Sequence, residues 1–291
     1  MLNSVSGEVE YKILYHYTNV KGLMGILDSQ CLWATDFRYT NDLSEIRYAK
    51  GIMKKVAMAY GDLKGDIGKN LDIILEMFLG DTKDILLFLF SVCDDGGDRL
   101  SQWRGYGSEG GGYSIGLSCR ELDKLKIQDM KKHYYDFIDF DKVFYGEMPQ
   151  EFKDEFHEML KFFDDYFQYK TEEIPEALEK HALILIKCLC RIKHLGFGEE
   201  KEYRVTAGLP ESKRKVSGNL VHRTIKFRPS ASGTLVPYVE LFREEDFYLP
   251  IKEIVIGPSR DMNERKDALD LLIKKKKLDI PVRKSDIPYR E

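Results

Sequence analysis

The spacing of apolar residues predicts strands and a helix at the start of the chain. Residues 11–16, Tyr-Lys-Ile-Leu-Tyr-His, are aromatic and branched enough for a strand, and 31–35 form a second short apolar strand. Between them, apolar residues recur at helical spacing over 20–27, and Thr18 or Asn19 can cap that helix. The chain therefore opens as strand, helix, strand.

The middle of the chain contains one strand that is apolar on both faces. Residues 85–93, Ile-Leu-Leu-Phe-Leu-Phe-Ser-Val-Cys, lack polar alternation, so both faces of this strand must be buried. A long, glycine-rich polar loop over 94–112 follows and leads into a strand at 113–117. Helices are expected over 41–59, 68–79, 148–169, 173–193 and 261–276.

Strand character returns in the last third of the chain. It is found over 202–207, 220–228, 234–242 and 253–256. Strands at both ends with helices grouped between them predict an α+β fold with mostly antiparallel pairing. The acidic, aromatic-rich helices of 147–194 are interpreted as a solvated helical insertion within a single domain over 1–291.

Composition narrows the class of protein. The 43% of hydrophobic residues excludes a disordered chain, and no run of eighteen apolar residues is present to span a membrane. A net charge of −4 argues against binding duplex nucleic acid by bulk charge. The five cysteines form no CxxC pair, and no signal peptide is recognised, so we expect a cytoplasmic protein without disulfides.

Two familiar kinds of site are disfavoured. Residues 105–110 match the G-x-G-x-x-G dinucleotide fingerprint, but that site needs a strand before the glycines and a helix after them, and a strand follows instead. No two histidines have the i, i+4 spacing of metal ligands, so no metal site is expected. Asp94, Asp95 and Asp98 are the one loop cluster that could hold magnesium in a nuclease, although aspartate is common in glycine-rich turns.

Three places in the sequence are candidates for binding or catalysis. His16 ends the first strand directly before Tyr17 and Thr18, where a binding role competes with a structural one. On a strand from residue 199 onward, Glu200 and Glu202 would share one face by the period of two. This acidic pair serves either to stabilise positive charge at a sugar carbon or as a solvated strand edge.

The third place is the Trp103-Arg104 pair in the glycine-rich loop. An indole can stack on a flat ring, and a guanidinium can bind a phosphate with two hydrogen bonds. The alternative for Trp103 is an anchor that holds the loop on the core.

A set of motifs resembles an uncharacterised bacterial domain family. The motifs run in order from Leu14 to about Pro258: LYHYT, LWAT with a following ND, SQWR-G-Y, YSIG, and a late E-x-E-aromatic-R. They cover nearly the whole chain, and the SQWR segment is the most specific of them.

The same order of motifs is similar to the H-Y-E arrangement of ADP-ribosyltransferases. That resemblance implies a split, mostly antiparallel sheet with flanking helices, in which His16 holds the ribose next to nicotinamide and Thr18 adds a hydroxyl contact. It further implies that Tyr113 stacks on the nicotinamide ring. Glu202 would be the catalytic carboxylate with Glu200 as its partner, although the choice among the glutamates at 199, 200 and 202 stays open.

The implied activity is transfer of ADP-ribose from NAD to a macromolecule, a glycosyl transfer typical of bacterial toxins and anti-phage effectors. NAD would contact Tyr17, Trp103 and Arg104 as well, and Arg104 or Lys21 would hold its diphosphate. Basic clusters at 213–215 and 274–277 favour a nucleic-acid acceptor, and a protein acceptor is nearly as well supported. A cognate antitoxin or inhibitor would accompany a toxin.

Two alternatives stay open at this point. In an NAD glycohydrolase, water takes the place of the acceptor. In a non-enzymatic nucleotide sensor, the same pocket binds without catalysis, and Glu202 is structural.

Overall fold

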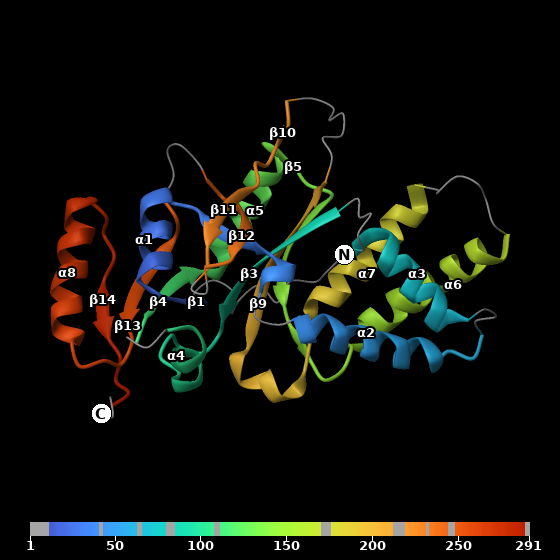
Figure 1. Cartoon of the computed structure of the whole chain (residues 1–291), viewed down its shortest axis with the longest axis horizontal. Helices are drawn as coiled ribbons and strands as arrows, with labels where there is room; N and C mark the ends of the chain where they lie inside the picture. The colour runs from blue at the N-terminus through green and yellow to red at the C-terminus, as the bar shows by residue number, and fades with distance from the viewer. Residues whose placement is uncertain are drawn as a thin grey trace.

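Helices and one large sheet make up the computed structural model of the chain (Figure 1). The structure describes residues 12–40, 43–62, 66–79, 85–107, 111–169, 176–211, 219–230, 233–243 and 248–288. The helices are α1 (Val20–Ser29), η2 (Phe37–Tyr39), α2 (Leu43–Met58), α3 (Ile67–Leu79), α4 (Leu100–Tyr106), α5 (Cys119–Met130), α6 (Gln150–Tyr169), α7 (Glu176–Arg191), η3 (Leu195–Glu200) and α8 (Met262–Lys275), where η marks a 3₁₀ helix. The strands are β1 (Ile13–Thr18), β2 (Leu32–Asp36), β3 (Ile85–Cys93), β4 (Tyr113–Ser118), β5 (His133–Tyr134), β6 (Phe137–Lys142), β7 (Phe144–Tyr145), β8 (Ile192–Lys193), β9 (Glu202–Pro210), β10 (Val221–His222), β11 (Lys226–Pro229), β12 (Leu235–Leu241), β13 (Ile251–Ile256) and β14 (Val282–Lys284).

Among the described residues, ten strands join in one mixed sheet. Eight of them follow the order β11-β12-β2-β3-β1-β4-β13-β14, while β9 pairs with β3 and β6 pairs with β9. Every pair is antiparallel except β13 with β14. The predicted α+β class with mostly antiparallel pairing is confirmed.

The sheet is split along one edge of β3. On its other edge, β3 pairs with β9 over its whole length, from Ile85 to Cys93. On the split edge, β2 pairs only with Phe88 and Leu89, and β1 pairs only where Tyr15 faces Cys93. The intervening part of β3 therefore has no strand beside it on that edge.

Strand β3 contributes side chains to two hydrophobic cores, one on each face of the sheet. Phe88 and Phe90 pack in a cluster with residues of α1, α5 and α8, whereas Ile85 and Leu87 pack with residues of α2, α3, α6 and α7. The prediction that both faces of this strand are buried is confirmed. Figure 1 shows the second group of helices at one end of the molecule and α8 at the other.

Helices α6 and α7 are less solvated than their charge suggested. Phe156 and Phe163 of α6 and Ile186 of α7 are fully buried in the second core. Glu158, which lies between these two phenylalanines of α6, is 73% exposed, as expected for the outer face of an amphipathic helix. The solvated character predicted for 147–194 is therefore wrong for one face of each helix, while the assignment as an insertion within one domain stays a prediction.

Other differences from the predicted elements are local. The loop predicted over 94–112 contains the short helix α4, whose residues include no glycine or proline before its last turn. A further helix that was not predicted, α5, follows β4. The strand predicted over 220–228 is two short strands in different sheets, β10 beside β5 and β11 beside β12. No helix in the described parts of the chain is long and apolar enough to cross a membrane.

The second core provides a test of how far α6 stabilises the fold. Phe156→Ala removes a fully buried ring, so we expect the free energy of unfolding to fall by about 3–5 kcal/mol. Met58→Ala is the control, because that side chain is 71% exposed and its loss should cost no more than about 0.5 kcal/mol. Urea denaturation of both variants measures the difference, and equal effects would mean that α6 adds little to the core.

Candidate functional site

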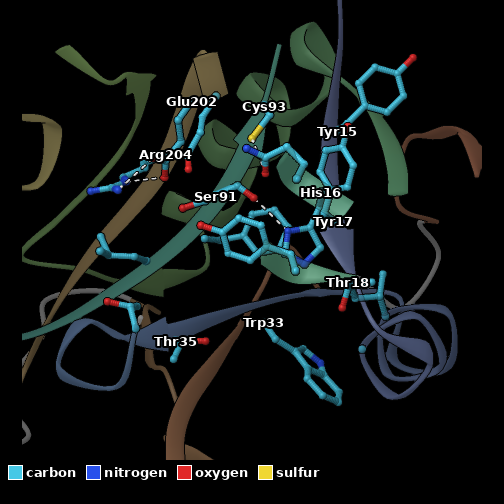
Figure 2. Close-up of a pocket in the computed structure, with 18 of the residues that line it drawn as sticks. Tyr15, His16, Tyr17, Thr18, Trp33, Thr35, Ser91, Cys93, Glu202 and Arg204 are labelled. Carbon is cyan, nitrogen blue, oxygen red and sulfur yellow. Dashed lines mark hydrogen bonds and ion pairs between the residues drawn. The ribbon is translucent and has the colours of Figure 1, made fainter. Parts of the chain in front are cut away.

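A cavity of about 280 Å³ opens where the sheet splits. It is lined by residues of β1, β2, β3 and β9, together with side chains from α1, α4, β8, β11 and the 3₁₀ helices. Figure 2 shows His16 on one side of this cavity, Glu202 and Arg204 on another, and Trp33 and Thr35 from β2 across from them. The split thus brings residues far apart in the sequence to one place.

His16 fills the gap between β1 and β3. Its Nδ1 lies 2.9 Å from the backbone oxygen of Ser91, and its ring stacks on Phe90 with 4.4 Å between ring centres. A carbonyl oxygen only accepts hydrogen bonds, so Nδ1 carries the proton and Nε2 is left as an acceptor. Burial, opposed by the hydrogen bond to Ser91 and assisted by the charge of Arg228, lowers the pKa of His16 to about 4. The imidazole is therefore neutral at pH 7.

Two glycines of α1 make room for the cavity wall. A Cβ atom on Gly22 would lie 2.0 Å from the hydroxyl oxygen of Thr18, and one on Gly25 would lie 2.2 Å from the indole of Trp33. Any larger residue would push one of these side chains out of place. The helix can therefore approach both Thr18 and Trp33, which line the cavity.

A buried group of charged side chains forms the opposite wall. The ammonium nitrogen of Lys193 lies 2.8 Å from Glu45, 2.6 Å from Glu200 and 3.1 Å from Glu202. Arg204 donates from Nε to Glu202 at 2.6 Å and from Nη2 to Glu45 at 2.6 Å. When all three carboxylates are ionised, this charge cluster carries one net negative charge.

The three carboxylates of the cluster differ in acidity. Burial raises the pKa of Glu202, but the charges of Arg204 and Lys193 outweigh it and lower that pKa to about 2. For Glu45 and Glu200, burial is the dominant cause and raises the pKa of each carboxyl. Glu202 is therefore ionised at every physiological pH, while the other two carboxyls accept a proton more readily.

The predicted acidic pair is present, but not for the predicted reason. Glu200 is the last residue of η3, and Lys201 follows in a left-handed conformation with φ 44° before β9 begins at Glu202. The two glutamates therefore do not share a strand face by the period of two. They meet because both bind Lys193, which no sequence motif pointed to. Glu199 is 69% exposed, pairs with Arg99 and lies outside the cavity lining.

The structure places the predicted residues of β1 in the cavity lining. Tyr17 and Thr18 line it together with His16, but the Tyr17 hydroxyl donates to Asp95 at 2.8 Å and accepts from the backbone nitrogen of Arg99. Both hydrogen bonds of this hydroxyl therefore hold the loop after β3 in place.

Four other predicted residues do not line the cavity. Trp103 is buried and donates to Asp98 at 2.8 Å, which fits the interpretation as an anchor for the loop. Tyr113 packs in the first core, opposite Thr18 in the β1–β4 ladder. Arg104 and Lys21 are exposed on helices α4 and α1.

Sequence reasoning missed two further side chains that line the cavity, one aromatic and one basic. Trp33 belongs to the LWAT motif, and Arg228 belongs to β11. The position of Trp33 on a short apolar strand next to the histidine strand was a usable signal. No local pattern marks Arg228.

The acidic loop residues proposed for a nuclease have structural partners. Asp94 pairs with Lys12 at 2.7 Å, Asp95 accepts hydrogen bonds from the Tyr17 hydroxyl and the backbone nitrogen of Gly97, and Asp98 accepts from two side chains. Across the parts of the chain that the structure describes, no three His, Cys, Asp or Glu residues gather in a way that could hold a metal ion. Residues 108–110 of the glycine motif lie outside the described residues.

Residues 102–205 match a family model. The family is described as "Protein of unknown function (DUF2971)". The matched part extends from α4 to β9 and includes Lys193, Glu200, Glu202 and Arg204, but not His16, and it is shorter than the stretch from Leu14 to about Pro258 over which the motifs were recognised. No curated protein and no solved structure matches the chain. These comparisons carry no activity, so the likeness to ADP-ribosyltransferases stays a proposal.

The charge cluster predicts a pH-dependent contribution to stability. Glu202→Gln removes the buried, ionised partner that Arg204 and Lys193 share, so we expect the free energy of unfolding at pH 7 to fall by about 3 kcal/mol or more. The pKa of Glu202 drops from 4.5 to about 2 on folding, so this contribution is complete above pH 4.5 and is lost as the pH falls toward 2. The difference between wild type and variant should shrink over that range.

Denaturant titrations at several pH values between 2 and 7 measure this difference. Glu199→Gln is the matched control, because that carboxylate is 69% exposed and should contribute little. A loss for Glu202→Gln that does not change with pH would show that the cluster does not depend on the ionised Glu202.

Proposed function

We propose that the chain is an NAD-dependent ADP-ribosyltransferase that transfers ADP-ribose to a macromolecule. The observation that supports this most directly is that His16 and the two glutamates of the E-x-E motif line one cavity in a split sheet. These are residues that the resemblance to the H-Y-E arrangement assigns to the ribose and to catalysis. His16 comes from β1, whereas the glutamates come from η3 and β9, more than half of the chain away.

Transfer of ADP-ribose from NAD needs few catalytic side chains, and residues that can serve in this way line the cavity. When the bond between ribose and nicotinamide breaks, its electron pair leaves with the positively charged ring, which departs as neutral nicotinamide. The sugar passes through an oxocarbenium-like state, which a nearby carboxylate stabilises. The acceptor then bonds to the anomeric carbon and loses a proton, with no metal or redox cofactor needed.

Each group has a role that fits its surroundings. The neutral His16, with Nε2 as acceptor, can receive a hydrogen bond from a ribose hydroxyl. The net negative charge of the cluster favours the cationic nicotinamide end of NAD. Lys193 and Arg204 hold Glu202 in one orientation, which limits the reorganisation needed in the transition state. Trp33 lines the cavity and offers a flat surface on which the nicotinamide ring can stack. The resemblance assigned this role to Tyr113.

A second candidate is a non-enzymatic nucleotide-binding module. The observation in its favour is that both oxygens of Glu202 already accept hydrogen bonds from Arg204, at 2.6 Å and 3.0 Å. A carboxylate held in this way serves the fold as well as a reaction. In that case the cavity binds a nucleotide without cleaving it, and Glu200 and Glu202 keep the wall of the cavity in place.

The acceptor is proposed only as a class, nucleic acid or protein. Of the two basic clusters that favoured nucleic acid, residues 213–215 lie outside the described residues, and Lys276 of the other pairs with Asp28. A role as a bacterial toxin or anti-phage effector, with a cognate inhibitor, rests on the resemblance alone. Water as acceptor would make the protein an NAD glycohydrolase.

Release of nicotinamide tests the proposed activity. The purified chain is incubated with labelled NAD and cell extract, and nicotinamide is measured together with label on protein, DNA and RNA. We expect wild type to release nicotinamide and Glu202→Gln to do so about 100-fold more slowly or worse, because the carboxylate acts where charge develops. The assay is run at a temperature at which circular dichroism shows the variant to be folded.

Glu199→Gln provides the matched control and should keep wild-type activity, since Glu199 lies outside the cavity lining. Label on a macromolecule supports the transferase, whereas release without label identifies the glycohydrolase. Tight binding of intact NAD with no release supports the binding module. Full activity of Glu202→Gln would refute the catalytic assignment.

A further inference from the structure

Arg228 differs from the other two cations that line the cavity. Lys193 and Arg204 are surrounded by the carboxylates of the charge cluster. Arg228 forms no ion pair with any carboxylate among the described residues, and its buried Nε has no hydrogen-bond partner there. Its side chain is half-buried. A guanidinium shielded from water in this way is normally paired, because loss of hydration without a counter-ion is costly.

Strand register places Arg228 on the same face of the sheet as Thr35 and Trp33, which line the cavity. Arg228 faces Val236 of β12, and Tyr238, two residues on, faces Thr35 of β2. Nη2 of Arg228 donates to the Thr35 hydroxyl at 2.9 Å, and the guanidinium carbon lies 5.9 Å from the ring centre of Trp33. These contacts fix the guanidinium without neutralising it.

We infer that Arg228 binds a phosphate group of a nucleotide ligand in the cavity. The terminal nitrogens of the guanidinium keep N–H groups that have no protein partner among the described residues, and these donors lie in a fixed plane, which suits two oxygens of a phosphate. The Thr35 oxygen accepts from Arg228, so its own proton is free to be donated to a third oxygen of the same anion. A phosphate can accept these donors on separate oxygens, whereas a carboxylate would have to accept two of them on one oxygen. Trp33 beside it offers a flat apolar surface for a ring of the ligand.

The phosphate subsite stands apart from the reaction proposed above. Binding of a phosphate at Arg228 does not depend on cleavage of NAD, whereas identifying that phosphate as part of the NAD diphosphate rests on the proposed function. In that case Arg228 takes the role that the resemblance left to Arg104 or Lys21, both of which lie outside the cavity lining.

Binding measurements with matched ligands test this inference. Pyrophosphate, ADP and adenosine are titrated into wild type, Arg228→Gln and Arg228→Lys by calorimetry. We expect Arg228→Gln to weaken ADP and pyrophosphate about tenfold or more, and to leave the affinity for adenosine unchanged, because only the charged hydrogen bonds are lost. Arg228→Lys should fall between the two, since lysine keeps the charge without the planar fork.

Arg243→Gln removes the same charge at an exposed position outside the cavity lining and should bind all three ligands as wild type does. Thermal unfolding adds a second readout. Without ligand, Arg228→Gln should be at least as stable as wild type, since an unpaired, half-buried charge is removed, and ADP should raise the Tm of this variant less than that of wild type.

Three results would overturn the inference: neither pyrophosphate nor ADP binds to wild type, Arg228→Gln binds them as tightly as wild type, or adenosine is weakened as much as ADP. The two proposals fail separately. Arg228-dependent ADP binding without nicotinamide release refutes only the proposed function. Nicotinamide release whose KM for NAD is the same in Arg228→Gln refutes only the phosphate subsite.

Discussion

The split along one edge of β3 is the constraint on which the rest of the site depends. Between the residues that pair with β2 and the one that pairs with β1, the backbone of β3 has no strand beside it on that edge. An unpaired backbone carbonyl in the interior is costly, and the ring of His16 satisfies that of Ser91. One hydrogen bond therefore closes the gap in the sheet and selects the imidazole tautomer. The cavity exists because a side chain, and not a strand, completes the edge.

The charge cluster also connects the helices around the second core to the cavity wall. Glu45 comes from α2 in the helical part of the molecule, Lys193 from β8, and Glu202 and Arg204 from the start of β9. Buried charges are tolerated only with nearly complete pairing, so each member requires the others to be in place. The position of the helices around the second core is thereby linked to the geometry of the cavity wall. A substitution on α2 that moved Glu45 would therefore also change the ion pairs that hold Glu202.

The sequence predicted the helices and strands of this site better than the contacts between them. The capped helix after His16 and the doubly buried strand at 85–93 follow from spacing and composition, because local patterns determine them. The pairing of Lys193 with Glu202 and the approach of Arg228 to Thr35 depend on register across several strands, which no local pattern encodes. The position of Tyr113 has the same origin: its strand was recognised, but not the pairing with β1 that places it in the first core and outside the cavity lining.

The charge cluster and Arg228 have opposite signs, and both line the cavity. The cluster around Lys193 carries one net negative charge when its carboxylates are ionised, and Arg228 carries one positive charge without a partner among the described residues. A ligand that carries a cationic ring and, further along the molecule, a phosphate would pair with both charges. NAD has this polarity before its nicotinamide bond breaks and loses the cationic end when the neutral ring departs. The same polarity would therefore favour the intact dinucleotide over the nicotinamide-free product, which retains only the attraction to Arg228.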